Sequence, residues 1–333
     1  MSQPADCAAL MTDALSCGYR GHDPVLQEVS LTMRAGRLVC VIGQNGAGKS
    51  TLMQTIAGLL PPVSGTVQIR GRRLNELSAR ERAQVLSVVL TGQRPPGFMT
   101  VRRYVELGRY PHLRPLGRAD ESHRSAVEEA LQIVGASPLI DRYVTELSDG
   151  ERQRVSLARA LAQSADVMLL DEPTAFLDVS GRAKTMDTLR SAAHSSGRLI
   201  ITSSHDIELV LRVADTVILI RPDRTLATGA PEDLVLSKEF DHLFADSTLR
   251  FDYERGGFAH RKPDGPLVTV HGGGQAGIWT RHAVERLGFE VGPAAPRHIT
   301  VPIDNHDRWS VTDTDGGQSS AGSLEELADL LRD

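Results

Sequence analysis

A glycine-rich stretch at residues 43–51, with the sequence GQNGAGKST, contains the residue types that bind phosphate. It follows the apolar run 38–42, typical of a buried strand, and precedes the run 52–57, typical of a helix. Glycines let successive N–H groups point at one anion, while the helix N-terminus and Lys49 add positive charge. Ser50 offers a hydroxyl to the Mg²⁺ that accompanies a nucleotide. We therefore predict a phosphate-binding loop; the flanking strand and helix disfavour an ordinary glycine turn.

Two carboxylates follow a second apolar strand, at residues 167–170. Ligands of parallel α/β proteins bind at the carboxyl edge of the sheet, where such side chains lie. Asp171 is suited to orient the Mg²⁺ shell, and Glu172 is suited to position or deprotonate an attacking water. Acidic pairs after apolar strands are common, so this pair alone leaves the chemistry open.

Residues 147–154 open a helix with Ser148 as the cap and a second glycine, Gly150. The hydroxyl and the helix N–H groups predict a second anion site, although a well-capped helix without a ligand fits the same residues. Gln93 follows the apolar residues 88–90, and His205 follows the strand 200–202. Each is unremarkable by itself and is also explained as a solvated turn residue.

The elements that must position these side chains alternate along the chain. Residues 12–90 are rich in short β-forming runs, whereas residues 100–162 have helical spacing and capping residues. Strands and helices alternate again from residue 167 to residue 220. This order predicts an α/β fold with a parallel sheet and a mostly helical insert.

The bulk composition excludes several classes of protein. The chain has 333 residues and a net charge of −5, which gives no general attraction to nucleic acid. It contains no apolar run near the ~20 residues needed to cross a bilayer and no signal peptide at the start, so we expect a soluble, cytoplasmic protein. The three cysteines lack paired or metal-ligand spacing, and we expect no metal beyond Mg²⁺.

Taken in order, Tyr19, the loop 43–51, Gln93 and the stretches 147–153 and 169–178 with His205 resemble the ATP-binding subunits of ATP-binding-cassette (ABC) transporters. The resemblance spans about residues 12–245. Two stretches depart from the commonest family motifs: LSDGE at residues 147–151 replaces LSGGQ, and AFLD at residues 175–178 replaces SALD. Both variants, with residues 104–112, resemble importers for iron complexes, haem and cobalamin.

The resemblance implies a role for each motif residue. Tyr19 is expected to stack on adenine, Ser148 and Gly150 to contact the γ-phosphate held by an opposite subunit, and Asp178 to link two sites across a dimer. The implied ATP contacts are Tyr19, Gly43, Gln44, Asn45, Gly46, Ala47, Gly48, Lys49, Ser50, Thr51, Leu147, Ser148, Asp149, Gly150, Glu151 and Asp178. The implied catalytic residues are Lys49, Gln93, Glu172 and His205, and the implied Mg²⁺ ligands are Ser50, Gln93 and Asp171, the last through water.

The same resemblance implies a fold and partners: a P-loop NTPase core with an antiparallel β subdomain and the helical insert. Two copies are expected to enclose two MgATP molecules and to drive polytopic permease subunits at the cytoplasmic side of the membrane, with a substrate-binding protein as an indirect partner and no nucleic acid. The expected cargo is an iron complex, haem or cobalamin. A soluble ABC ATPase and a transporter of another solute remain the alternatives.

The sequence also predicts the domain limits. We expect an ATP-binding domain at residues 12–246 with its helical subdomain at about 94–163, a linker at 247–263, and a small acidic α/β domain at 264–333. From Pro263 onward the chain has five Lys and Arg against eleven Asp and Glu. Strands are predicted at 267–270, 298–301 and 309–311, and helices at 280–287 and 323–331. The glycine turn at 271–274 is interpreted as a structural turn or as an effector site. The domain itself is expected to regulate the ATPase or to help the dimer form.

Overall fold

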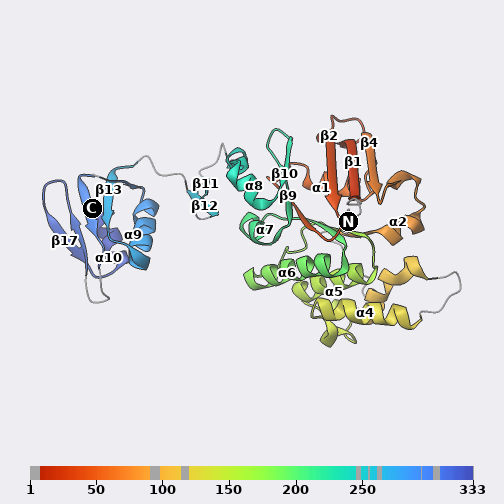
Figure 1. Cartoon of the computed structure of the whole chain (residues 1–333). Helices are drawn as coiled ribbons and strands as arrows, with labels where there is room; N and C mark the ends of the chain where they lie inside the picture. The colour runs from red at the N-terminus through yellow and green to blue at the C-terminus, as the bar shows by residue number, and fades with distance from the viewer. Residues whose placement is uncertain are drawn as a thin grey trace, which may run out of the picture. The chain divides into compact units, whose positions relative to one another are not determined.

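The computed structural model describes residues 8–90, 98–113, 120–244, 249–253, 256–260, 265–293, 295–302 and 308–332. The chain divides into two compact units, one of residues 1–245 with 251–257 and one of residues 246–250 with 258–333 (Figure 1). Over the described residues, every helix is too short or too polar to span a membrane.

An antiparallel sheet forms the first layer of the larger unit. Its strand order is β2-β1-β4-β5, and each neighbouring pair is antiparallel. The strands are β1 (Ala8–Cys17), β2 (Leu26–Arg34), β4 (Ser64–Ile69) and β5 (Arg72–Arg73). The expected antiparallel β subdomain is therefore confirmed, and Tyr19 lies in the turn after β1.

A six-stranded sheet with the order β10-β9-β3-β8-β7-β6 forms the centre of the larger unit. Its strands are β3 (Leu38–Gly43), β6 (Leu86–Val89), β7 (Val167–Leu170), β8 (Leu199–Ser203), β9 (Thr216–Ile220) and β10 (Leu226–Gly229). Five strands run parallel and β10 is antiparallel to β9. Because helices cover a parallel sheet on both faces, its strands must be apolar throughout, as β3 and β7 are.

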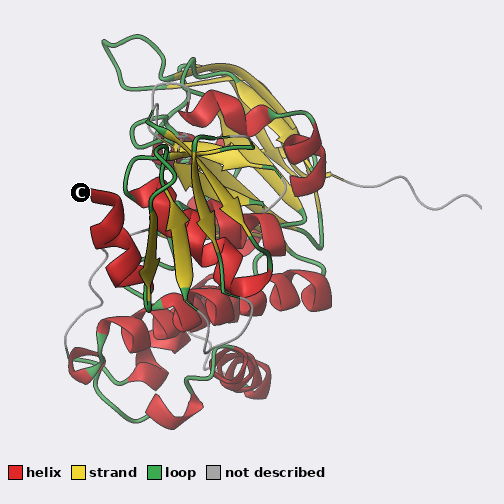
Figure 2. Cartoon of the chain, turned by 90° about the vertical axis from the view of Figure 1, so that its left-hand side faces the viewer, coloured by secondary structure: helices red, strands yellow, loops and turns green. Residues whose placement is uncertain are grey.

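Helices surround this sheet and form the predicted insert. Those near the sheet are α1 (Lys49–Ile56), α2 (Ala79–Val85), α6 (Val179–Ser196), α7 (Ile207–Val213) and α8 (Pro231–Leu236). The insert contains α3 (Val101–Glu106), α4 (Glu121–Ile133) and α5 (Asp149–Ala162). Short 3₁₀ helices lie at Leu74–Glu76, Leu107–His112, Ser137–Leu139, Val144–Glu146 and Glu239–Phe244. Figure 1 shows α4 and α5 of the insert below the strands of the unit, and helices also lie below strands in Figure 2.

Capping residues begin the insert helices where the sequence predicts. Thr100 accepts from the Arg103 N–H at the start of α3, and Asp120 accepts from the His123 N–H at the start of α4. The apolar stripe of α4 is buried, with Val127 and Leu131 in the interior. The insert is therefore a packed helical subdomain.

The smaller unit is a two-layer α/β domain, as predicted. Its strands, in the order β14-β13-β15-β16-β17, are β13 (Leu267–His271), β14 (Glu290–Val291), β15 (Arg297–Thr300), β16 (Trp309–Thr312) and β17 (Gln318–Ala321). Helices α9 (Gly274–Arg286) and α10 (Leu324–Arg332) share one apolar core with this sheet. Among the described residues, β14 and β17 were not predicted, and α9 begins six residues earlier than expected.

The early start of α9 has a local cause. Gly274 and Gly277 are poor helix formers, so the sequence pattern does not predict a helix over the first turn of α9. A Cβ on Gly277 would lie 2.7 Å from the Gly272 carbonyl oxygen, so the first turn packs too closely on the preceding loop for a larger residue.

Two short strands lie where the sequence predicts only a linker. β11 (Leu249–Asp252) and β12 (Gly257–His260) form a two-stranded sheet. Phe251 of β11 is buried and its ring stacks on Phe240 with centroids 4.7 Å apart. This aromatic contact attaches β11 to the 3₁₀ helix that contains Phe240.

Candidate active site

The phosphate loop connects β3 to α1 at the carboxyl edge of the parallel sheet. Residues 44–48 form the turn, and Lys49, Ser50 and Thr51 begin α1. Gly46 and Gly48 have φ values of 79° and 107°, which side chains rarely adopt. A Cβ on Gly48 would approach Val25 Cγ1 to 2.9 Å. Both glycines are therefore required for the turn that exposes backbone N–H groups to an anion.

The Lys49 side chain is buried and folds back onto the start of this loop. Its Nζ donates to the carbonyl oxygens of Gly43 at 2.9 Å and Gln44 at 3.0 Å, and the residue is only 6% exposed. Burial lowers the pKa of Lys49, and the charges of Glu172 and Asp171 oppose that shift. The ammonium group is thus fixed beside the loop and near two carboxylates.

Asp171 and Ser50 supply oxygen donors at the same edge. The Ser50 Oγ lies 3.5 Å from Asp171 Oδ1, which also accepts from Ser203 Oγ at 2.7 Å. Hydroxyl and carboxylate oxygens are the ligands that Mg²⁺ uses beside a nucleotide. The residues present therefore fit that ion.

Ser203 is the site residue that the sequence analysis missed. It lies at the end of β8, is fully buried, donates to Asp171 and accepts from the Glu172 N–H at 2.9 Å. The register pairs Leu170 of β7 with Thr202 of β8, which brings Asp171 and Ser203, the next residue along the chain from each, together. The sequence did contain a signal for this residue: Ser203 ends an apolar strand that could be expected to pair with the strand before Asp171 and Glu172.

Glu172 and His205 form the outer part of the network. His205 Nε2 lies 2.5 Å from Glu172 Oε1. Glu172 has a φ of 49°, an uncommon backbone conformation for a glutamate and one that is often found at functional sites. The arrangement holds a carboxylate and an imidazole against each other, as required to hold and move a proton.

The start of α5 carries the LSDGE residues. Ser148 is the N-cap: its Oγ donates to Glu151 Oε2 at 2.9 Å and accepts from the Glu151 N–H at 3.3 Å. The Ser148 backbone N–H, followed by its hydroxyl, lowers the pKa of the Glu151 carboxyl. Glu151 also pairs with Arg142 at 3.3 Å, and Asp149 with Arg152 at 2.7 Å. The charges of Asp149 and Glu151, the two residues that differ from the common LSGGQ motif, are thus balanced by Arg152 on the same helix and by Arg142 before it.

The short loop before α6 contains Asp178 and also contacts Gly150 of α5. A Cβ on Gly150 would lie 3.2 Å from Leu177 Cδ2, so Leu177 packs against the glycine. Asp178 caps α6 by accepting from the Gly181 N–H at 2.7 Å. Phe176, in the same loop, is 81% exposed, and Tyr19 is 51% exposed. These groups line surfaces rather than a closed pocket.

Gln93 lies outside the described residues. A further contact of the loop was not predicted: the Gln44 side-chain amide donates to the Leu243 carbonyl at the end of the last 3₁₀ helix of the unit. The phosphate loop is therefore tied to the segment that leads toward the smaller unit.

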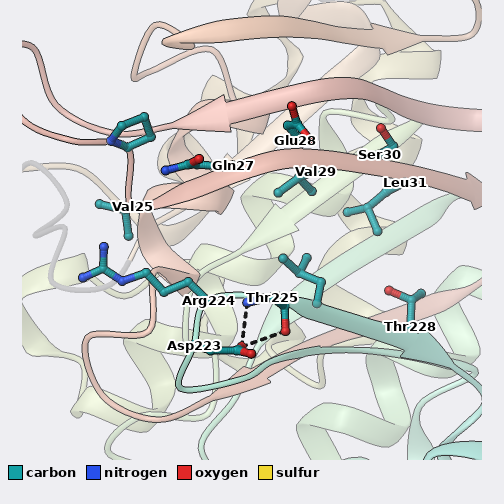
Figure 3. Close-up of a pocket in the computed structure, with 12 residues that line it drawn as sticks. Val25, Gln27, Glu28, Val29, Ser30, Leu31, Asp223, Arg224, Thr225 and Thr228 are labelled. Atoms are coloured by element: carbon teal, nitrogen blue, oxygen red, sulfur yellow. Dashed lines mark hydrogen bonds between the residues drawn. The ribbon is translucent and has the colours of Figure 1, made fainter.

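A cavity of ≈ 700 Å³ opens between β2 and the hairpin of β9 and β10 (Figure 3). Gln27, Glu28 and Ser30 line it from β2, while Asp223, Arg224 and Thr225 line it from the hairpin turn. Asp223 accepts from both the N–H and the hydroxyl of Thr225. None of the lining residues belongs to the predicted ATP contacts, but Val25, which lines the cavity, packs against Gly48 of the phosphate loop.

Comparison with known proteins places both parts of the chain. Residues 26–175 match the family model "ABC transporter", and residues 264–332 match "Iron ABC transporter C-terminal domain". An uncharacterised ABC transporter ATP-binding protein of Methanocaldococcus jannaschii is 39% identical over 71% of this chain and 81% of its own length. A probable siderophore transport system ATP-binding protein of Bacillus subtilis is 35% identical over 72% and 86%.

The fold agrees with these relatives. The structure of cbiO1 from Clostridium perfringens, part of the ABC transporter complex cbiONQ, has a TM-score of 0.61 at 28% identity and covers 70% of this chain and 92% of that chain. The site geometry, the sequence relatives and this structural match agree, and the chain belongs to the family of ABC transporter ATP-binding proteins.

Proposed function

We propose that this chain hydrolyses MgATP at a site completed by a second copy of itself, and that it couples this reaction to import through a membrane permease. The observation that carries the proposal is the connected group Asp171, Ser203, Glu172 and His205 beside Lys49. This group supplies a cation for the phosphates, a carboxylate at the Mg²⁺ site and a carboxylate base, which phosphoryl transfer to water requires.

The phosphate loop and Lys49 bind the β- and γ-phosphates. Their N–H and ammonium groups are fixed before the reaction, so they stabilise developing charge without reorganisation. Ser50 and Gln93, with Asp171 through water, would hold Mg²⁺, which would neutralise phosphate charge. Ser203 orients Asp171 through the 2.7 Å hydrogen bond.

Glu172 accepts the proton of the attacking water. His205 contacts the Glu172 carboxylate at 2.5 Å, and Ser203 holds the Glu172 backbone at 2.9 Å. These two contacts hold the base close enough to Lys49 for the two charges to interact, and a positioned base is the requirement for general-base catalysis.

The second copy contributes Ser148 and Gly150. Their helix start exposes a hydroxyl and N–H groups, and the acidic neighbours Asp149 and Glu151 are already paired with arginines. Tyr19 stacks on adenine, and Asp178 connects the two sites of the dimer. ATP that contacts both copies favours dimer closure, and hydrolysis reverses it.

We assign the protein to the cytoplasmic side of the membrane, bound to polytopic permease subunits near Gln93 and the helical insert, with a substrate-binding protein as an indirect partner. The cargo is an iron complex, haem or cobalamin. The siderophore transport relative, the iron transporter C-terminal match and the motif variants support an iron complex first.

Deletion of the chain tests the cargo directly. Uptake of a labelled ferric siderophore, haem and cobalamin is measured in the deletion strain and after complementation with the wild-type chain. Loss of one of the three supports the assignment, whereas loss of an unrelated solute alone contradicts it. Copurification with nucleic acid or ribosomes and without a polytopic membrane protein would favour a soluble ABC ATPase.

The smaller unit regulates the ATPase or assists dimer formation. The match of residues 264–332 to the model "Iron ABC transporter C-terminal domain" supports a role for this unit in the same transporter. We take residues 12–246 as the ATPase domain, 247–263 as its connection and 264–333 as the regulatory domain. Removing residues 264–333 should change the ATPase rate, dimerisation or transport; unchanged values for all three would contradict the role.

A further inference from the structure

The sheet of the smaller unit has one apolar face and one polar face. Residues Val270, Ile299 and Val311 share their core with α9 and α10. Side chains alternate along a strand, so the intervening residues lie on the opposite face. These are Thr269, His271, His298, Thr300, Ser310 and Thr312. Both described helices of this unit therefore pack on the apolar face.

Two histidines meet on the polar face. β13 and β15 run parallel, with Thr269 opposite His298 and His271 opposite Thr300, so the two histidines are diagonal neighbours. His271 Nε2 lies 3.0 Å from His298 Nδ1, and the rings are stacked with centroids 5.2 Å apart. His271 is exposed and His298 half-buried, so solvent reaches the pair.

A shared metal ion explains this spacing. Bonds from imidazole nitrogen to Zn²⁺ are about 2.0–2.1 Å long, so two ligands of one ion have nitrogens about 2.9 Å apart at a right angle and about 3.3 Å apart at the tetrahedral angle. An N–H···N bond between water-accessible rings is the other explanation, but its net contribution is small because water offers equal partners. The parallel pairing of β13 and β15 holds the two histidines side by side before an ion binds, which favours chelation.

We propose that His271 and His298 bind one divalent first-row transition-metal ion on the polar face of the C-terminal domain. Imidazole suits Zn²⁺, Ni²⁺, Cu²⁺ and Fe²⁺ rather than Mg²⁺ or Ca²⁺. Among the described residues, no group of three or more His, Cys, Asp or Glu side chains forms a metal cluster. The described residues therefore supply two donors, and water can complete the shell, which makes the ion exchangeable rather than structural.

Calorimetric titration of the full chain, prepared without a polyhistidine tag, tests this site with ZnCl₂ and NiCl₂. His271→Ala and His298→Ala should each weaken binding by more than about tenfold, since even indirect changes around a metal site cost that much. His282→Ala is the matched control: it removes an exposed histidine of the same unit whose ring lies 5.4 Å from Trp279. It should bind like the wild type.

A second variant and a second measurement separate the metal from the hydrogen bond. His271→Gln keeps a polar partner for His298 but not an imidazole ligand, so it should lose the metal as His271→Ala does. Histidine ring signals in NMR spectra should move for residues 271 and 298 together on adding Zn²⁺. Three results would each overturn the proposal: unchanged metal affinity in both alanine variants, an equal loss of metal affinity in His282→Ala, or ring signals of residues 271 and 298 that do not move when Zn²⁺ is added.

Discussion

The phosphate-loop group and the α5 start differ in how their polar groups are satisfied. Lys49 and Ser203 are buried, and Asp171, Ser203, Glu172 and His205 are connected to one another. Ser148, by contrast, is part of an exposed cap whose partner is Glu151. The first group is assembled by one chain. The second presents its groups to solvent, as expected for a surface completed by another copy.

The loss of the base should have the largest effect. Glu172→Gln keeps the shape of the side chain but removes the proton acceptor, so ATP hydrolysis should fall by about 10²–10⁴. ATP binding should persist, and ATP-bound dimers should accumulate in size-exclusion chromatography. Glu121→Gln, an exposed change at the start of α4, is the control. Near-normal hydrolysis by the Glu172 variant would remove Glu172 from its role.

Lys49→Ala should follow, with a loss in hydrolysis of about 10²–10³, since it removes one fixed cation from the developing phosphate charge. ATP binding, measured by equilibrium dialysis, should weaken as well. Lys184→Ala changes an exposed lysine on α6 and should leave both unchanged. Equal activity of the two variants would contradict the assignment of the phosphate loop.

Ser203→Ala should have an intermediate effect of about 10–100-fold on kcat, because Ser203 positions Asp171 and Glu172 without touching ATP. The Mg²⁺ concentration for half-maximal activity should rise too, which a general loss of stability would not cause. Ser204→Ala alters the neighbouring buried serine, whose Oγ accepts from Asp206 N. If the two variants share one Mg²⁺ dependence, Ser203 has no specific positioning role.

Ser148→Ala should have the smallest effect on hydrolysis, about tenfold, equivalent to one hydrogen bond to a charged group. It also removes a helix cap, which costs about 0.5–2 kcal/mol of stability. Ser78→Ala separates these effects, because Ser78 and Glu81 form the same capping box on α2. Both variants should lose similar stability in urea unfolding, whereas only Ser148→Ala should lose ATPase activity; equal activity would make Ser148 a cap alone.

The sequence was sufficient for features that depend on neighbouring residues. The glycines around Lys49, the cap at Ser148 and the apolar strands are local patterns, and the structure confirms the fold they predict. Ser203 was missed because its role depends on the register of β7 beside β8. The contact of Gln44 with Leu243 joins residues almost two hundred positions apart. β17, with the polar sequence QSSA, is a strand only because β16 pairs with it.

Mixing Lys49→Ala with Ser148→Ala tests the composite site most directly. Each variant alone should be impaired at both sites of its dimer. A mixed dimer holds one site with an intact phosphate loop and an intact Ser148, so random mixing should restore about a quarter of the wild-type sites. The account predicts ATPase activity above that of either variant alone. No gain, with mixed dimers demonstrated by native mass spectrometry, would contradict a site shared between two copies.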